Sequence, residues 1–259
     1  MKNIIFFDID GTIYVGGSNG VHQEVIDAIH DTQRKGNLCF VCSGRPYGFI
    51  AQNIKDIGFD GYVLANGAQT VYQNKNIDVS YLEIDRVRQL INYFDKKDLQ
   101  YVLATPDGVY LKKNFTYLWD FYKTCNIETD KFISDFDLED IYSKVIKIEV
   151  YYKNKDNFND IESIANDFFF MDQGASLVGE LTREDITKGI GIKNTLDNLS
   201  IDRSHSYCFG DGENDIEMFK AVAHPIAMEN AIDEIKNLSE EICDSVENDG
   251  VAKKLEELF

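Results

Sequence analysis

Two aspartates separated by one residue, Asp8 and Asp10, follow an apolar run near the start of the chain. Residues i and i+2 of an extended segment face the same side, so both carboxylates can point into one site. Neighbouring acids repel each other, and an ordinary turn needs only Asn-Gly or Ser-Gly. Alone, Asp-Ile-Asp-Gly suits a turn or the start of a calcium loop as well as a reaction centre, but the EF-hand pattern is not completed.

Three further polar signals follow predicted strands or open predicted helices. Ser43 comes after the apolar run LCFVC, and Lys188 opens the helix that follows a long insertion. The segment GDGEND at 210–215 places Asp211 and Asp215 directly after SYCFG. Ligands of open parallel sheets bind at the carboxyl ends of the strands, so we expect these residues to join the N-terminal aspartates in one site.

Carboxylates that converge on one edge of a sheet are costly unless a cation is present. A set of oxygen ligands favours Mg²⁺ over zinc. Together with Lys188 and Ser43, such a metal makes a site for a phosphate dianion. Asp8 can then attack phosphorus, because the cations offset its repulsion from phosphate, and Asp10 can protonate the departing alcohol.

The elements that must position these residues alternate between strand and helix. Strands are predicted at 3–7, 37–42 and 61–68, with a helix at about 21–35 between the first two. The same rhythm returns after the insertion, with a helix from about 188. This alternation predicts an α/β fold with a parallel sheet that helices cover on both faces.

The insertion has a different pattern. Between 81 and 183 the strands look longer and partly amphipathic, and helical stretches at about 85–97, 114–124 and 157–167 lie between them. This pattern predicts an α+β domain with a mostly antiparallel sheet. We therefore expect a catalytic core formed by residues 1–80 and 184–259, interrupted by a second domain at 81–183.

Composition narrows the classes of partner. The net charge is −19, from 26 basic and 45 acidic residues, and such a surface repels nucleic acid. No apolar run of about 18 residues predicts a membrane span, and the N-terminus does not resemble a secretory signal. The five cysteines are scattered and odd in number, which suits a reducing compartment. We therefore expect a cytoplasmic protein without a membrane or nucleic-acid partner.

Four segments resemble, in order, the motifs of the haloacid dehalogenase-like (HAD) phosphatases: DIDGT at 8–12, SGR at 43–45, Lys188 and GDGEND at 210–215. Three others are similar to subsidiary signatures of the Cof-type, class IIB branch: NGA at 66–68, AMENA at 227–231 and NDGV at 248–251. Two positions depart from the family pattern. Cys-Ser-Gly-Arg stands where Ala-Thr-Gly-Arg is common, and Glu229 replaces a usual glycine.

The resemblance implies a Rossmann-like HAD core with an inserted α+β cap domain of the C2B type. It also implies a Mg²⁺-dependent phosphatase that hydrolyses small phosphorylated metabolites, such as sugar phosphates, through an aspartyl-phosphate. By resemblance, the catalytic residues are Asp8 (nucleophile), Asp10 (general acid and base) and Lys188 (phosphate clamp). The implied phosphate contacts are Thr12, Ser43, Gly44 and Asn214, and the implied Mg²⁺ ligands are Asp8, the Asp10 carbonyl and Asp211, with Asp215 as a supporting acid.

A phosphomutase built on the same core is one alternative. Such an enzyme must hold and reorient an intermediate, so its cap needs additional cationic phosphate contacts. The insertion contains Arg86, Arg88, Lys112 and Lys113, but these residues lie among acids or on amphipathic elements, which favours solvated surface. A sugar bisphosphate that stimulates activity would favour the mutase.

A non-enzymatic regulator that binds a phosphorylated ligand is the second alternative. The intact aspartates and lysine argue against it, because binding alone does not require a nucleophile. The sequence leaves open which metabolite is the substrate and whether the protein is a monomer or a homodimer.

Overall fold

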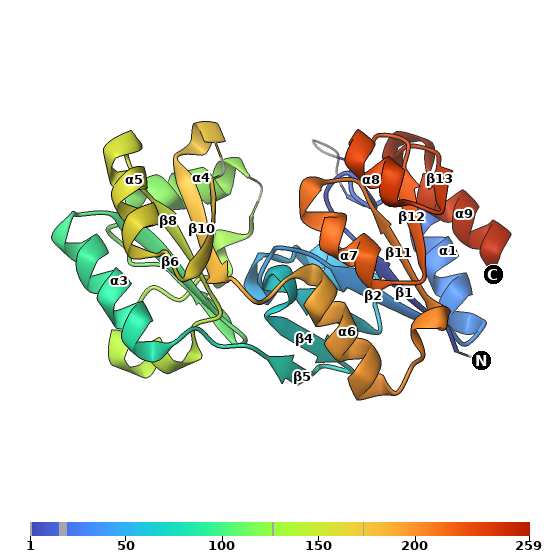
Figure 1. The fold of residues 1–259 in the computed structure, drawn as a ribbon, viewed down its shortest axis with the longest axis horizontal. Helices are drawn as coiled ribbons and strands as arrows, with labels where there is room; N and C mark the ends of the chain where they lie inside the picture. The colour runs from blue at the N-terminus through green and yellow to red at the C-terminus, as the bar shows by residue number, and fades with distance from the viewer. Residues whose placement is uncertain (1, 16–19, 126, 173) are drawn as a thin grey trace. The chain divides into compact units, whose positions relative to one another are not determined.

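The computed structural model describes residues 2–15, 20–125, 127–172 and 174–259, and the chain divides into two compact units (Figure 1). The first unit comprises Met1–Gly44, Gln52–Asp78 and Thr187–Phe259, and the second comprises Arg45–Ala51 and Val79–Ile186. Among the described residues, no helix has the length and apolar character that a membrane span requires.

The first unit is built on an eight-stranded sheet with the order β13-β12-β11-β1-β2-β3-β4-β5. The strands from β13 to β3 in this order pair in parallel, and β4 pairs antiparallel with β3. The strands are β1 (Ile4–Phe7), β2 (Leu38–Cys42), β3 (Gly61–Leu64), β4 (Gln69–Tyr72), β5 (Lys75–Val79), β11 (Ser206–Gly210), β12 (His224–Met228) and β13 (Glu241–Cys243).

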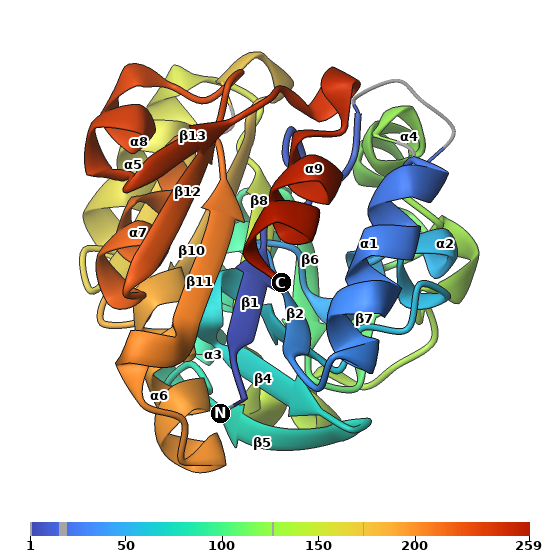
Figure 2. The same cartoon turned by 90° about the vertical axis from the view of Figure 1, so that its right-hand side faces the viewer.

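Helices cover both faces of this sheet, with α1 and α9 on one face and α6, α7 and α8 on the other (Figure 2). The helices of the unit are α1 (Gln23–Arg34), α2 (Gln52–Lys55), α6 (Lys188–Leu199), α7 (Ile216–Ala221), α8 (Asp233–Leu238) and α9 (Gly250–Leu258). Every residue of β1 and β2 is buried, as expected for parallel strands covered on both faces. The predicted α/β core is thus present.

The edge formed by β4 and β5 differs from the predicted parallel sheet. The two strands are joined by Gln73 and Asn74, which both have positive φ angles, of 49° and 60°. Two consecutive residues of this conformation form the tight turn that matches the twist of antiparallel strands. The prediction of a parallel sheet is therefore incomplete at this edge.

The second unit is built on a five-stranded antiparallel sheet with the order β7-β6-β8-β10-β9. Its elements are α3 (Ile84–Lys96), β6 (Gln100–Thr105), β7 (Gly108–Tyr110), α4 (Thr116–Thr124), β8 (Lys147–Tyr151), α5 (Lys155–Ile164), β9 (Phe168–Asp172) and β10 (Val178–Arg183). On α3 the buried residues Val87, Leu90, Ile91 and Phe94 recur at helical spacing and form one apolar face.

The short segment Arg45–Ala51 belongs to the second unit, although the sequence analysis assigned it to the core. Phe49 explains the difference. Its ring is buried in the apolar cluster of the second unit, 5.0 Å from the ring of Tyr122 and 5.4 Å from that of Phe132. Aromatic pairs at such distances contribute about 0.5–1.5 kcal/mol beyond the burial of their area.

Candidate active site

Asp8 directly follows β1, at the carboxyl end of the parallel strands of the first unit. Its main-chain N–H donates to the carbonyl of Phe209 at 3.0 Å, which continues the hydrogen bonding of β1 with β11 by one residue. The side chain is only 8% exposed. The sheet itself therefore fixes the position of the Asp8 carboxylate.

Lys188 is the first residue of α6 and is fully buried. Its ammonium donates to Oδ1 of Asp8 at 2.6 Å and to Oδ1 of Asp215 at 2.7 Å. The hydroxyl of Thr187 caps the helix by accepting from the N–H of Ile190 at 3.2 Å. The start of α6 thus delivers the ammonium between two carboxylates.

A glycine allows α6 to begin so close to the neighbouring turn. Gly67 has a φ of +98°, and a Cβ added there would lie 2.2 Å from the carbonyl oxygen of Thr187. A larger residue would therefore displace the start of the helix that carries Lys188.

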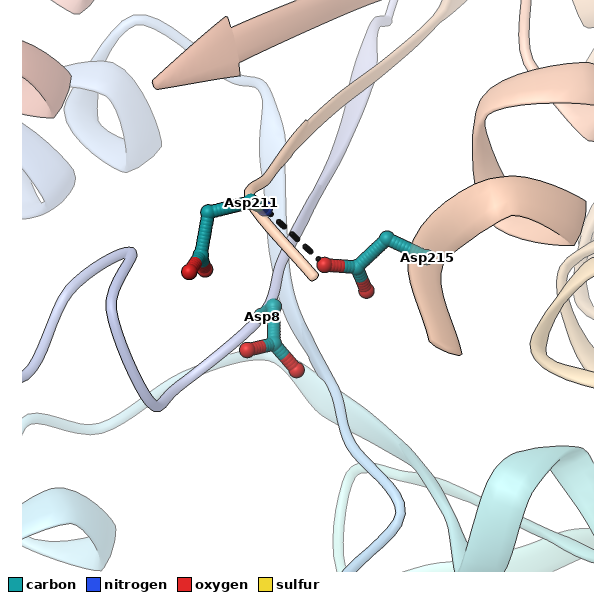
Figure 3. A group of neighbouring side chains, drawn as sticks. All are labelled: Asp8, Asp211 and Asp215. Atoms are coloured by element: carbon teal, nitrogen blue, oxygen red, sulfur yellow. Dashed lines mark hydrogen bonds between the residues drawn. The ribbon is translucent and has the colours of Figure 1, made fainter. Parts of the chain in front are cut away.

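Asp215 organises the loop that follows β11. Its Oδ2 accepts from the main-chain N–H groups of Asp211 at 3.0 Å and Gly212 at 3.1 Å, and the first of these bonds is drawn in Figure 3. Because its Oδ1 binds Lys188, this fully buried carboxylate ties α6 to the loop.

Asp211 lies against the turn that follows Asp8. The hydroxyl of Thr12 donates to Oδ1 of Asp211 at 2.8 Å. Gly11 has a φ of +84°, and a Cβ added there would lie 2.3 Å from Oδ2 of Asp211. Thr12 is predicted from its motif to contact phosphate, and in this structure its hydroxyl donates to the Asp211 carboxylate.

Asp8, Asp211 and Asp215 form an acidic group in which one oxygen of each lies within 4.8 Å of the others (Figure 3). Burial raises the pKa of Asp8 to about 7, although Lys188 opposes this shift. Burial likewise raises the pKa of Asp211 to about 6. Both carboxylates therefore favour a bound proton or cation.

Lys188 remains charged in this setting. Burial alone would lower its pKa, but Asp215 and Asp8 more than offset burial, so the pKa of Lys188 lies above its usual value. One ammonium thus faces three carboxylates. The remaining negative charge and the all-oxygen donor set fit a hard divalent cation such as Mg²⁺.

Two of the residues predicted to act at the site are exposed. Asp10 lies in the turn after β1, where it forms an isolated β-bridge with Tyr14. Asn214 lies in the short helical turn that ends at Asp215. Exposure suits groups that meet a ligand or water.

The other predicted phosphate contacts follow β2. Ser43 is buried and its N–H donates to the carbonyl of Val63 at 2.9 Å. A Cβ added to Gly44 would lie 2.8 Å from Oδ1 of Asn66, so the two loops are in close contact. Asn66 has a φ of +55° and an N–H that donates to the carbonyl of Ser43 at 3.3 Å. Asn66 belongs to the NGA signature at 66–68, and no role is predicted for it.

A second asparagine without a predicted role also reaches the site. Nδ2 of Asn230 donates to the carbonyl of Gly11 at 2.8 Å, and its Oδ1 accepts from the N–H of Val246 at 3.0 Å. The AMENA signature at 227–231 is the feature of the sequence that points to it.

Three of the four cationic residues that the mutase alternative would need form ion pairs within the second unit, and the fourth, Lys113, is exposed. Arg86, Arg88 and Lys112 form ion pairs with Asp167, Glu139 and Asp95, respectively. These contacts agree with the interpretation of these residues as surface ion pairs.

Comparisons with known proteins extend over nearly the whole chain. YkrA of Bacillus subtilis (strain 168) is 26% identical over 274 residues, which cover 99% of this chain and 98% of that protein. The 5-amino-6-(5-phospho-D-ribitylamino)uracil phosphatase YitU of the same organism is 23% identical over 272 residues, covering 99% and 97%.

Similarity of fold also extends over nearly the whole chain. The solved structure of the HAD subclass IIB sugar phosphatase BT4131 superposes with a TM-score of 0.80 at 22% identity and covers 98% of each chain. The predicted Rossmann-like core with an inserted domain is therefore confirmed as a fold. A family model of haloacid dehalogenase-like hydrolases matches residues 5–255, so the chain belongs to that family of enzymes, as its motifs predicted.

Proposed function

We propose that this protein is a Mg²⁺-dependent phosphatase that hydrolyses small phosphorylated metabolites, sugar phosphates among them, through an aspartyl-phosphate on Asp8. The contact between Lys188 and Asp8, 2.6 Å long and buried beside two more carboxylates, carries the proposal. The ammonium lowers the repulsion that an attacking carboxylate meets at a phosphate dianion. YitU and BT4131, both named as phosphatases, support the same activity.

Two aspartates have separate tasks in the proposed reaction: Asp8 attacks phosphorus and Asp10 transfers protons. Lys188 holds Oδ1 of Asp8, and we assign Oδ2 to the attack on phosphorus. The bond from phosphorus to the alcohol oxygen breaks as the bond to Asp8 forms, and Asp10 gives its proton to the departing alcohol. Water then attacks the same phosphorus and Asp10 takes the proton from that water. The bond from phosphorus to Asp8 breaks, which releases inorganic phosphate and restores the carboxylate of Asp8.

The residues that would hold Mg²⁺ are Asp8, Asp211 and the main-chain carbonyl of Asp10, with Asp215 in support. The raised pKa values of Asp8 and Asp211 and the all-oxygen donor set fit such an ion. When bound, Mg²⁺ supplies positive charge that neutralises and orients the transferred phosphoryl group. Asp215 is already bonded to Lys188 and two main-chain amides, so we assign it the task of positioning.

The phosphate contacts remain assigned to Ser43, Gly44 and Asn214. Thr12 is not among them, because its hydroxyl donates to Asp211, and we assign it to the orientation of that carboxylate. We further propose that the inserted domain serves as a cap that selects among phosphate esters. Every residue to which we assign a chemical role lies outside the insertion, which supports this division of tasks.

Release of inorganic phosphate tests the proposal. Purified protein is assayed on a panel of phosphorylated metabolites and on nitrophenyl phosphate, before and after exhaustive dialysis against EDTA. We expect dialysis to remove activity and Mg²⁺ to restore it, whereas Ca²⁺ should inhibit because its larger, looser coordination shell misplaces Asp8.

Each alternative has its own outcome in this assay. Full activity after dialysis would refute the metal dependence. Stimulation by a sugar bisphosphate would favour the phosphomutase. Failure to release phosphate from any ester in Mg²⁺ would favour the non-enzymatic regulator.

A further inference from the structure

One amide side chain joins three loops at the carboxyl end of the sheet of the first unit. Asn230, in the loop after β12, donates from Nδ2 to the carbonyl of Gly11 at 2.8 Å. Its Oδ1 accepts from the N–H of Val246, in the loop after β13, at 3.0 Å. The side chain therefore uses a donor and an acceptor at once, as an amide can.

The Gly11 carbonyl belongs to the peptide that links Gly11 to Thr12, and both residues meet Asp211. The α-carbon of Gly11 leaves no space for a Cβ beside the Asp211 carboxylate. The hydroxyl of Thr12 donates to Oδ1 of Asp211 at 2.8 Å. Rotation of this peptide would therefore move the groups that fix the orientation of the Asp211 carboxylate.

The loop that carries Asn230 also holds the main chain of Asp211. The N–H of Ile232 donates to the carbonyl oxygen of Asp211 at 3.1 Å. The same loop thus restrains Asp211 twice, once through its own carbonyl and once through Asn230 and the Gly11–Thr12 peptide.

We propose that Asn230 is a positioning residue that sets the orientation of the Asp211 carboxylate and thereby the affinity of the site for Mg²⁺. The inference rests on the proposed function, since it assumes that the ion binds at Asp211. Asn230 acts through Gly11 and Thr12 rather than on substrate. Groups that orient metal ligands in this way typically change metal affinity by about 10-fold to 100-fold when they are replaced.

Two substitutions and one matched control isolate this role. Asn230→Ala removes both hydrogen bonds, and Asn230→Leu removes them while keeping a side chain of similar size. Asn198→Ala is the control, because Asn198 is an exposed asparagine on α6 whose Nδ2 donates to the carbonyl of Asn194 at 2.9 Å. The control therefore loses the same type of contact at a place unrelated to Asp211.

Mg²⁺ binding to the full-length protein is measured by titration calorimetry without substrate. The Mg²⁺ concentration that gives half-maximal hydrolysis of nitrophenyl phosphate is measured in parallel. We expect both Asn230 variants to raise the Mg²⁺ dissociation constant by about 10-fold or more and to shift the half-maximal concentration by the same factor. Turnover at saturating Mg²⁺ should stay within a few-fold of wild type, and Asn198→Ala should match wild type in every measurement.

Unchanged Mg²⁺ affinity in both Asn230 variants would overturn the inference while leaving the proposed function intact. A loss of turnover that saturating Mg²⁺ does not restore would also overturn it, because such a loss indicates a general disturbance of the fold. A wild-type protein that binds no Mg²⁺ in the calorimeter would refute the proposed metal dependence and the inference with it.

Discussion

Each of the two units buries a lysine between two carboxylates, yet the two clusters differ in what surrounds them. In the first unit, Lys188 lies between Asp8 and Asp215. In the second unit, the ammonium of Lys147 lies 3.0 Å from Glu149 and 2.6 Å from Glu180. Both lysines are almost inaccessible to solvent, at 1% and 2% exposure. Burial of a charged triad is therefore common to both units.

The three side chains of the cluster around Lys147 are all buried. Glu149 and Glu180 are register partners on the adjacent antiparallel strands β8 and β10, and both are buried. The hydroxyl of Tyr122, from α4, donates to Glu149. Each carboxylate thus meets a donor from the protein, as the burial of charge requires.

The cluster around Lys188 lies at the carboxyl ends of parallel strands and adjoins a third carboxylate. Asp211 is only partly buried, and its pKa is raised to about 6 by burial. Within the described part of the chain, Asp8, Asp211 and Asp215 are the one group of three side chains that could share a metal ion. What distinguishes the candidate site is therefore not the burial of a lysine between two carboxylates, which both units have, but the third, partly buried carboxylate of Asp211 beside it.

The largest expected effect is on turnover. Asp8→Asn should reduce the turnover of nitrophenyl phosphate by roughly 10⁴-fold or more, because an amide is a poor nucleophile and metal ligand. Glu149→Gln is the matched change in the second unit and should leave turnover within a few-fold of wild type. Initial rates are compared, with circular dichroism to verify folding. More than a trace of Mg²⁺-dependent activity in Asp8→Asn would contradict the assignment of the nucleophile.

Asp10→Asn should lower kcat by roughly 10²–10⁴-fold, because protonation of the leaving group is lost. The loss in kcat/KM should be greater for an alkyl phosphate than for nitrophenyl phosphate, whose leaving group needs less assistance. The measurement is kcat/KM for both esters in the variant and in wild type, because this ratio reports the steps up to phosphorylation of Asp8 and not the hydrolysis that follows. An equal loss for the two esters would count against Asp10 as the general acid.

Matched substitutions of the two lysines separate stability from chemistry. Lys147→Met leaves Glu149 and Glu180 without their cation and should lower the free energy of unfolding by about 3–5 kcal/mol. The folded fraction should retain its turnover. Lys188→Met should impair both KM and kcat, because the ammonium balances the acids around the phosphate.

Urea denaturation and steady-state kinetics check these expectations. If Lys147→Met inactivates a stably folded enzyme, Lys147 does not serve stability alone and the distinction between the two lysines is wrong. The distinction is also wrong if Lys188→Met has the kinetics of wild type.

The smallest expected effect concerns Thr12. Thr12→Val keeps the shape of the side chain but removes the donor to Asp211. The Mg²⁺ concentration for half-maximal activity should rise by about 10-fold, while KM for the ester at saturating Mg²⁺ should stay near that of wild type. A rise in KM with unchanged Mg²⁺ dependence would instead indicate that Thr12 contacts the phosphate, as its motif implies.

The acidic site itself could be predicted from the sequence because strand ends locate it. Asp8 and Asp211 each follow an apolar strand, and the carboxyl ends of parallel strands meet at one edge of a sheet. Lys188 was predictable because it opens the helix that resumes the α/β rhythm after the insertion. These features are local in sequence, and the structure brings these three residues together with Asp215.

The remaining features depend on contacts between distant residues. Asn230 reaches the main chain of Gly11, 219 positions away, and no local pattern encodes that hydrogen bond. Likewise, Phe49 lies in a segment that looks like part of the core, but its ring packs in the second unit. The β4–β5 hairpin was missed because its turn, Gln73-Asn74, lacks the glycine that usually signals such a turn.

The most direct test of Asp8 as the nucleophile is to trap the covalent aspartyl-phosphate. Asp10→Asn protein is mixed with nitrophenyl phosphate and Mg²⁺, quenched in acid during turnover, digested and examined by mass spectrometry. Because the good leaving group needs no acid while hydrolysis of the intermediate needs a base, one phosphoryl group should accumulate on Asp8. The same sample made with an additional Asp8→Asn change should remain unmodified. A phosphoryl group on another residue, or turnover with an unmodified Asp8 peptide throughout, would contradict the account.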